Sequence, residues 1–185
     1  MRRGKVELLE LLRSHGARPQ VTDIDRFLCA CRLADSAEMR NLGPDLAGQL
    51  DEKDYVVLVE AAAEGRTESV RLMLDAGFPI ETRGDDGGTA LHVASYAGSA
   101  STVQFLLERG ADLESRDTTW DSTPIDWVKV GSGHHPDHCP DSDWVATARI
   151  LIEAGASLAE LNLGPDSEKP ASGEVDELLR SYGVS

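Results

Sequence analysis

Apolar residues recur along this chain in short blocks whose spacing is typical of amphipathic helices. Val103, Leu106 and Leu107 occupy positions i, i+3 and i+4, which lie on one face of a helix. Gly98 precedes this block and Gly110 follows it. Glycine commonly ends helices because it adopts the left-handed conformation without strain. The pattern predicts a repeating order of short helix, tight turn, second helix and projecting loop.

The same pattern returns at an offset of 33 residues. The coinciding pairs are Leu58 with Leu91, Ala61 with Ala94, Gly65 with Gly98, Val70 with Val103, Leu74 with Leu107, Gly77 with Gly110, and Arg83 with Arg116. A helix pair with one apolar stripe on each helix cannot enclose a core, whereas copies stacked side by side bury both stripes. We therefore expect an all-α solenoid of stacked helix-turn-helix units with projecting loops.

A later unit carries extra residues. Residues 89–92 recur as residues 123–126, at an offset of 34. Gly110, at the end of the same unit, recurs as Gly155 at an offset of 45. The difference, 45 − 34 = 11 residues, places an insertion near 132–142. This stretch is rich in Gly, His, Pro and Asp, which is typical of loops.

The repeating unit resembles the ankyrin repeat. The match runs almost position by position through Gly87, Gly88, Thr89, Ala90, Leu91, His92, Ala94, Gly98, Val103, Leu106, Leu107, Gly110, Ala111 and Asp112. Thr-Ala-Leu-His stands in place of the family's usual Thr-Pro-Leu-His, and Thr-Pro-Ile-Asp follows later in the chain. The resemblance is strongest over 51–116 and extends to 158. The arrangement is similar to that of bacterial ankyrin proteins with an insertion in their last full repeat.

The resemblance implies one ankyrin-repeat solenoid over residues 1–185. Its expected parts are a partial repeat at 2–19, a degenerate repeat at 20–50, repeats at 51–83 and 84–116, a repeat with the insertion at 117–160, and a C-terminal cap at 161–185. In the degenerate repeat, Phe27, Ala30 and Cys31 form the inner-helix pattern. The N-terminal half-repeat leaves two alternatives: the chain is a fragment of a longer repeat protein, or a single helix caps the stack.

The charge balance excludes several partner classes. Lys and Arg number 18 and Asp and Glu 33, so the formal charge is 18 − 33 = −15. A chain so acidic repels nucleic-acid phosphates and anionic membrane surfaces. The cysteines Cys29, Cys31 and Cys139 are odd in number, which indicates reduced thiols rather than a disulfide framework. We expect a cytoplasmic monomer without cofactor, nucleic acid or membrane.

Ankyrin repeats are scaffolds for protein–protein contact, and the resemblance implies where a partner would bind. The expected surface consists of loop tips and the exposed side of the inner helices: Glu52, Lys53, Tyr55, Asp85, Asp86, Tyr96, Ala97, Thr119, Trp120 and Ser122. Tyr and Trp commonly anchor interfaces, which makes Tyr96 and Trp120 candidate anchors. The alternative for each ring is packing within the protein's own fold.

The loops are acidic, which bears on the charge of the partner. The carboxylates in question are Glu52, Asp85, Asp86, Asp117 and Asp121. They favour an unidentified protein with a basic surface. The alternative is that they only solvate an acidic protein.

Other functions remain open at this stage. The insertion contains side chains that can bind transition metals, namely His134, His135, His138 and Cys139. Structural zinc sites usually combine two well-spaced pairs of ligands, and only one cluster occurs here. A metal-binding module is therefore kept as an alternative and is not the main expectation. Trp127 and Trp144 are expected to form a local core under the insertion, with a small-ligand pocket as its alternative. A structural spacer in a longer protein is another.

No set of residues predicts catalysis. The Gly-Ser-Gly of residues 131–133 lacks the Gly-x-Ser-x-Gly spacing of a nucleophile elbow. Residues 85–89 contain glycines but not the lysine of a phosphate-binding loop. His92 stands beside Thr89, and in the family that the chain resembles this histidine is structural. We therefore expect no enzyme activity.

Overall fold

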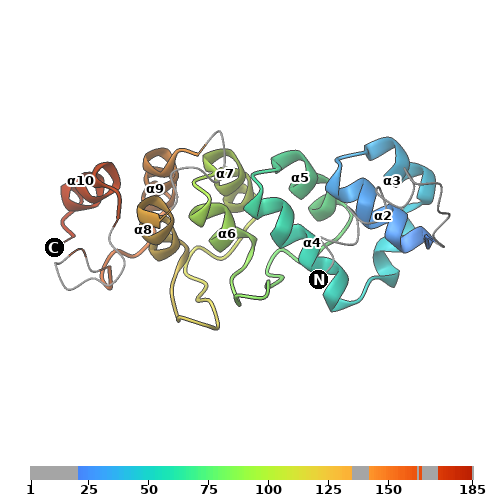
Figure 1. The fold of residues 1–185 in the computed structure, drawn as a ribbon, viewed down its shortest axis with the longest axis horizontal. Coiled ribbons are helices and arrows are strands. Elements are labelled where there is room, and N and C mark those ends of the chain that lie inside the picture. The colour runs from blue at the N-terminus through green and yellow to red at the C-terminus, as the bar shows by residue number, and fades with distance from the viewer. Residues whose placement is uncertain (1–20, 135–141, 162, 164–170, 185) are drawn as a thin grey trace.

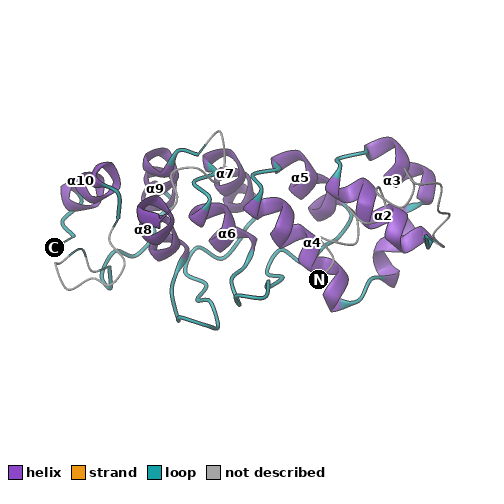
Figure 2. Cartoon of the chain, viewed as in Figure 1, coloured by secondary structure: helices purple, strands orange, loops and turns teal. Residues whose placement is uncertain are grey.

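The computed structural model describes residues 21–134, 142–161, 163 and 171–184. Over these ranges the chain forms helices joined by loops and contains no strand (Figure 2). The helices are α2 (Asp23–Arg32), α3 (Ser36–Leu42), the 3-10 helix η1 (Pro44–Gln49), α4 (Glu52–Ala63), α5 (Thr67–Asp75), α6 (Ala90–Tyr96), α7 (Ala100–Glu108), α8 (Pro124–His134), α9 (Trp144–Glu153) and α10 (Gly173–Ser181). The predicted all-α fold is confirmed.

The helices stack in two rows along an elongated molecule (Figure 1). Helices α2, α4, α6 and α8 form the inner row, and α3, α5, α7 and α9 form the outer row. Neighbours in each row pack together, as α4 does with α6 and α5 with α7. Helix α10 closes the C-terminal end by packing on α8 and α9. Each helix pair therefore buries its apolar stripe against the next pair.

Equivalent positions of successive units form the core. Leu58 in α4, Leu91 in α6 and Ile125 in α8 have 0%, 1% and 2% of their surface exposed. In the outer row, Val70 and Val103 are fully buried. The offsets of 33 and 34 residues therefore correspond to one step along the stack.

The degenerate repeat keeps its inner helix. Phe27, Ala30 and Cys31 are 2%, 4% and 0% exposed, which confirms their assignment to the core. The second half departs from the pattern, because α3 has only 7 residues and ends at Leu42, and Gly43 leads directly into η1. The partial repeat expected at 2–19 lies outside the described residues.

At the start of each inner helix, a side chain three residues after the cap residue accepts from the N–H of the cap residue. In α2 the Thr22 side chain accepts from the Asp25 N–H, and the Asp25 side chain accepts from the Thr22 N–H. The same exchange joins Asp51 with Asp54 in α4. In α6 the Thr89 N–H donates to Nδ1 of His92, and in α8 the Thr123 N–H donates to the Asp126 carboxylate. Such caps satisfy N–H groups that the helix cannot bond itself. The Asp residues replace the histidine of the Thr-x-x-His motif without loss of the acceptor.

The expected insertion is partly helical. Helix α8 runs to His134 and has 11 residues, against 7 in the equivalent helix α6. Residues 132–134 therefore extend the helix rather than form a loop, which corrects the composition-based expectation. The Ser132 Oγ donates to the Lys129 carbonyl at 2.9 Å and accepts from the Ser172 N–H at 3.1 Å, which joins this extension to the start of α10. Residues 135–141 lie outside the described residues.

The turn within each helix pair requires a left-handed residue. Gly65 and Gly98 both have φ of 67°, and each is followed by an N–H that donates back to the preceding helix. The equivalent residue of the degenerate repeat is Ala34, with φ of 54°. A residue with a Cβ is strained there by about 1 to 2 kcal/mol.

Replacing Ala34 with glycine is therefore expected to stabilise the protein. The gain should be about 0.5 to 1 kcal/mol, because relief of strain exceeds the extra entropy of glycine in the unfolded chain. Urea denaturation of wild type and Ala34→Gly measures it. Ala63→Gly, an exposed helical site with no strain to relieve, is the control and should lower the free energy of unfolding. A loss of stability in both variants would refute this explanation.

Leu106→Ala is expected to cost about 2 to 5 kcal/mol, because Leu106 is fully buried between neighbouring helix pairs. The half-buried Leu107 offers a control in the same helix, and Leu107→Ala should cost less. Denaturation gives both values. Hydrogen exchange should show the first loss of protection in α5, α7 and α9, because stability is local in a repeat stack. An unchanged denaturation midpoint for Leu106→Ala would contradict the core assignment.

Candidate interaction surface

Two loops project from the inner row of helices (Figure 1). We call residues 76–89, between α5 and α6, finger 1, and residues 109–123, between α7 and α8, finger 2. Arg83 of finger 1 donates to the Gly87 carbonyl at 2.6 Å and to the Arg116 carbonyl of finger 2 at 2.9 Å. Arg116, the equivalent residue, donates to the Asp121 carbonyl at 2.7 Å and to Glu160 at 2.5 Å. Each arginine therefore fastens its own finger and bonds to the following unit.

Carboxylates form a second ladder between units. The Asp112 N–H of finger 2 donates to Glu81 of finger 1 at 2.9 Å. One unit further along, the Ser157 N–H donates to Glu114 at 2.8 Å. Glu81 and Glu114 are separated by 33 residues, the length of one repeat. The fingers are thus held in register by charge-assisted bonds to the backbone.

A buried histidine joins the base of finger 1 to finger 2. The Thr89 N–H donates to Nδ1 of His92 at 3.1 Å, and Nε2 of His92 donates to the Ser122 carbonyl at 3.1 Å. This pattern requires the neutral imidazole, with its proton on Nε2. Burial lowers the pKa of His92 below its ordinary value, although bonding to the Ser122 carbonyl and the charge of Asp117 act in the opposite direction. The neutral form is therefore part of the folded structure.

The buried carboxylate of Asp117 organises the tip of finger 2. Its Oδ1 accepts from the N–H groups of Thr119 at 2.8 Å and Trp120 at 2.6 Å. Its Oδ2 accepts from the Ser122 N–H at 3.1 Å and from Nε1 of Trp127 at 2.9 Å. Burial by itself raises the pKa of Asp117, but these donors outweigh burial and the net pKa lies below its ordinary value. The loop is thus wrapped around an ionised carboxylate.

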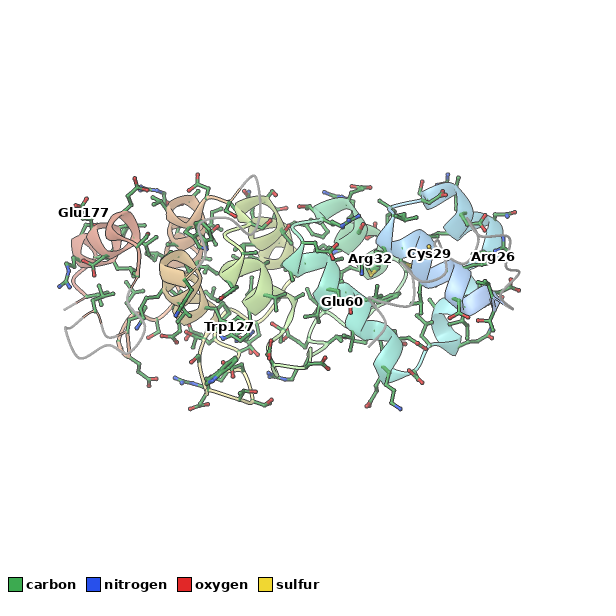
Figure 3. All side chains as sticks on the ribbon, viewed as in Figure 1. Arg26, Cys29, Arg32, Glu60, Trp127 and Glu177 are labelled. Atoms are coloured by element: carbon green, nitrogen blue, oxygen red, sulfur yellow. The ribbon has the colours of Figure 1, made fainter. Side chains whose placement is uncertain are left out.

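Trp127 lies at the base of finger 2 (Figure 3) and is only 7% exposed. Its ring makes edge-on contacts with His92, Tyr96 and Trp120, at centroid distances of 5.5, 6.0 and 5.7 Å. Trp120 covers this cluster from outside and keeps 52% of its surface exposed. The result is an aromatic cluster with one indole at the surface.

The family model for ankyrin repeats in three copies matches residues 1–117, which is more than half of the chain. The chain belongs to the ankyrin-repeat family. The matched range contains the described helices from α2 to α7.

Several curated relatives align with part of this chain. The chain is 33% identical over 122 residues to Serine/threonine-protein kinase 12 of Arabidopsis thaliana, covering 61% of this chain and 26% of the kinase. It is 31% identical over 111 residues to the Transient receptor potential cation channel subfamily A member 1 homolog of Caenorhabditis elegans, covering 60% and 8%. It is 42% identical over 69 residues to human B-cell lymphoma 3 protein, covering 35% and 15%. The chain thus spans at most about a quarter of these relatives.

The ankyrin fingers contain part of the surface expected from sequence. Asp85, Asp86 and Thr119 are exposed, and Ser122 is half-buried. Tyr96 is half-buried, and burial raises the pKa of its hydroxyl. These residues and Trp120 lie on the fingers or at the end of α6 beside them.

Three of the expected residues lie on α4, outside the fingers. Glu52, Lys53 and Tyr55 lie in the first turn of α4, because Asp51 caps a helix there. The chain has no glycine pair at this point to build the turn that Gly87 and Gly88 make in the next ankyrin repeat. Glu52 and Lys53 are still exposed, whereas Tyr55 packs edge-on against Phe78, with 5.2 Å between ring centroids.

Two expected surface residues are buried. Ala97 is 4% exposed because the segment before α9 covers it, and the Ser142 Oγ donates to its carbonyl at 2.8 Å. Asp117 is 2% exposed, so it shapes finger 2 and does not present its charge to a partner. A signal for this role existed in the sequence, since Asp side chains commonly accept N–H groups two and three residues ahead. The hydrogen bond from Nε1 of Trp127 to the Asp117 carboxylate had no such signal in the sequence.

The insertion under which Trp127 and Trp144 were expected to form a local core lies mainly outside the described residues, and within them the two rings make different contacts. Trp127 belongs to the aromatic cluster of finger 2. Trp144 packs on Gly98, just after the C-terminal end of α6, and donates from Nε1 to the Tyr96 carbonyl at 2.9 Å.

The metal-binding alternative falls mainly outside the described residues, where His135, His138 and Cys139 lie. His134 ends α8, is exposed, and lies with Nδ1 3.1 Å from the Val130 carbonyl oxygen. Among the residues that the structure describes, no three or more His, Cys, Asp or Glu side chains gather as a metal site would require. Over the same residues, no helix is long and apolar enough to cross a membrane.

Acidification through pH 6.5 is expected to destabilise the protein through His92. The pKa of His92 is lowered on folding, so its stabilising neutral form is fully present above the unfolded-state pKa near 6.5 and its contribution is lost as pH falls below that value. The loss by pH 5.5 can reach at most about 1.4 kcal/mol from this group. Urea denaturation at pH 7.5 and 5.5 measures it.

Two variants assign the effect to His92. His92→Asn keeps an acceptor for the Thr89 N–H but does not titrate, so its stability should change less between the two pH values. His134→Asn removes an exposed histidine and should retain the wild-type pH dependence. Equal pH dependence in all three proteins would show that His92 does not carry the effect.

Proposed function

We propose that this chain is a non-catalytic protein-binding module whose partner contacts fingers 1 and 2 and the adjoining exposed side of the inner helices. Ankyrin repeats are protein–protein interaction modules, and the ankyrin-repeat domain is typically non-catalytic. The observation that carries the proposal is Trp120, which is 52% exposed on a loop that Asp117 holds in one shape. A large, pre-positioned ring loses little entropy on binding.

The electrostatics of the fingers support a partner with a basic surface. Asp85 and Asp86 are exposed at the tip of finger 1, and the chain carries a net charge of −15. Opposite charges speed association and exclude acidic competitors. The same charge opposes binding to nucleic acid.

We further propose that the protein acts as a cytoplasmic monomer without a cofactor. Reduced thiols fit this compartment. Burial raises the pKa of Cys31 to about 12, so its thiol stays protonated and unreactive. Cys29 is half-buried on α2.

Removing the two surface rings is expected to abolish partner capture. Wild type and the Tyr96→Ala/Trp120→Ala double variant are used as baits in native lysate, and bound proteins are identified by mass spectrometry. Loss of an interface hot spot should lower capture by about tenfold or more.

Tyr182→Ala provides the matched control, because Tyr182 is 46% exposed on the C-terminal cap, away from the fingers. Circular dichroism and thermal unfolding first establish that each bait is folded. A protein captured by wild type and by Tyr182→Ala, but lost with the double variant, supports the proposal. Capture unaffected by the double variant would reject this surface, and no specific capture by wild type would reject the function.

A further inference from the structure

The carboxylates of the two fingers divide into engaged and unengaged groups. Engaged ones bond to backbone N–H groups or to arginine within the protein: Glu81, Asp112, Glu114, Asp117 and Asp121. Within the described structure, Asp85 and Asp86 are the finger carboxylates that have neither a hydrogen bond nor an ion pair. Both are exposed.

The cations nearest in sequence cannot neutralise this pair. Arg83 is committed to the carbonyls of Gly87 and Arg116, and Arg116 is committed to Asp121 and Glu160. The turn itself is rigid, because the Gly84 N–H donates to the Gly88 carbonyl at 2.9 Å and the Gly87 N–H to the Gly84 carbonyl at 2.9 Å. Two negative charges are therefore held at the tip of finger 1 without a counter-charge.

The tip of finger 1 lies against finger 2. The Thr118 N–H donates to the Gly87 carbonyl at 3.4 Å. The approach is so close that a Cβ added to Gly87 would lie 2.0 Å from the Thr118 Oγ1, and Gly87 has φ of +73°. Asp86 is the residue before this contact, and Trp120 lies two residues after it in finger 2. The finger that carries Asp85 and Asp86 thus contacts the finger that carries Trp120, close to both sets of side chains in the sequence.

This combination fits a cation better than an apolar group. The π-face of tryptophan attracts cations, and arginine is found over it more often than lysine. Trp120 meets Trp127 edge to face at an interplanar angle of 65°, so the rings are not stacked face to face. An apolar partner side chain would leave two carboxylates beside it without compensation.

We propose that an arginine side chain of the protein partner binds here, with its guanidinium on the Trp120 ring and its charge balanced by Asp85 and Asp86. Arginine suits the site because a planar guanidinium stacks on an indole and still donates to carboxylates from its edge. The inference rests on the proposed protein-binding function and specifies the chemistry that the fingers recognise. The rest of the partner is then positioned over the adjoining end of α6.

An acetylated, amidated hexa-arginine peptide serves as the probe, with a hexa-citrulline peptide of the same shape and no charge as the comparison. Binding to wild type is measured by calorimetry and by the indole N–H signals in NMR, where Trp120→Phe assigns the Trp120 signal. We expect hexa-arginine to shift the Trp120 signal and leave that of Trp144 in place. Hexa-citrulline should not bind.

The decisive variant is Asp85→Asn/Asp86→Asn, which removes charge at exposed positions and keeps side-chain shape. It should weaken hexa-arginine binding by about three- to tenfold. Its matched control is Glu174→Gln/Glu177→Gln on α10, where both residues are exposed and the net charge changes equally, from −15 to −15 + 2 = −13. The control should bind within about twofold of wild type, since only overall charge has changed.

The ring contributes separately. Trp120→Leu should weaken binding by about two- to fivefold, whereas Trp120→Phe should lose less because it retains an aromatic face. Equal weakening by the finger and α10 charge variants would overturn the proposal and leave only non-specific attraction. Hexa-lysine binding as tightly as hexa-arginine would overturn the choice of guanidinium over ammonium.

Failure of this inference can be told apart from failure of the proposed function. If Asp85→Asn/Asp86→Asn captures the same lysate protein as wild type while Tyr96→Ala/Trp120→Ala does not, protein binding stands and the arginine site is rejected. If the probe experiments succeed but no lysate protein is captured, the site exists and the proposed function fails.

Discussion

Stacking is the constraint on which the rest of the structure depends. A single helix pair here has one apolar stripe per helix, and residues such as Leu58, Leu91 and Leu106 lose their contact with water only when the next pair is in place. The hydrophobic effect therefore acts between units, and each unit must present its neighbour with the same surface. That requirement explains why an offset of 33 residues carries so much of the sequence pattern.

The helix caps and the turns between helices recur along the stack, although different residues form them. Each inner helix needs an acceptor side chain three residues after its cap residue. The imidazole of His92 supplies it in one helix and the carboxylate of Asp54 in another. The turn after the inner helix needs a left-handed residue, and Ala34 occupies it at a cost that Gly65 avoids. The degenerate repeat is thus degenerate in side chains and retains the backbone geometry of its neighbours.

The fingers show how a repeat scaffold produces a specific surface. One unit is joined to the next by hydrogen bonds of Arg83, Glu81 and His92. The Asp117 carboxylate accepts hydrogen bonds that shape finger 2. The Trp120 indole stays exposed, and the carboxylates of Asp85 and Asp86 have neither a hydrogen bond nor an ion pair within the described structure. Rigidity and recognition are linked, because the bonds that occupy most of the polar groups also hold the remaining ones in place.

The sequence alone determined the fold class, the period, the core positions and the family, since these follow from local patterns that every unit must repeat. It also indicated the fingers and Trp120 as a surface. Only the tertiary structure decided which residues face outward, because that depends on contacts between units. Ala97 and Asp117 look like loop-surface residues in the pattern, yet a covering segment buries one and four N–H groups surround the other. Tyr55 likewise lies in a helix because Asp51 caps it, and Trp127 bonds to Asp117 whereas Trp144 bonds to the Tyr96 carbonyl.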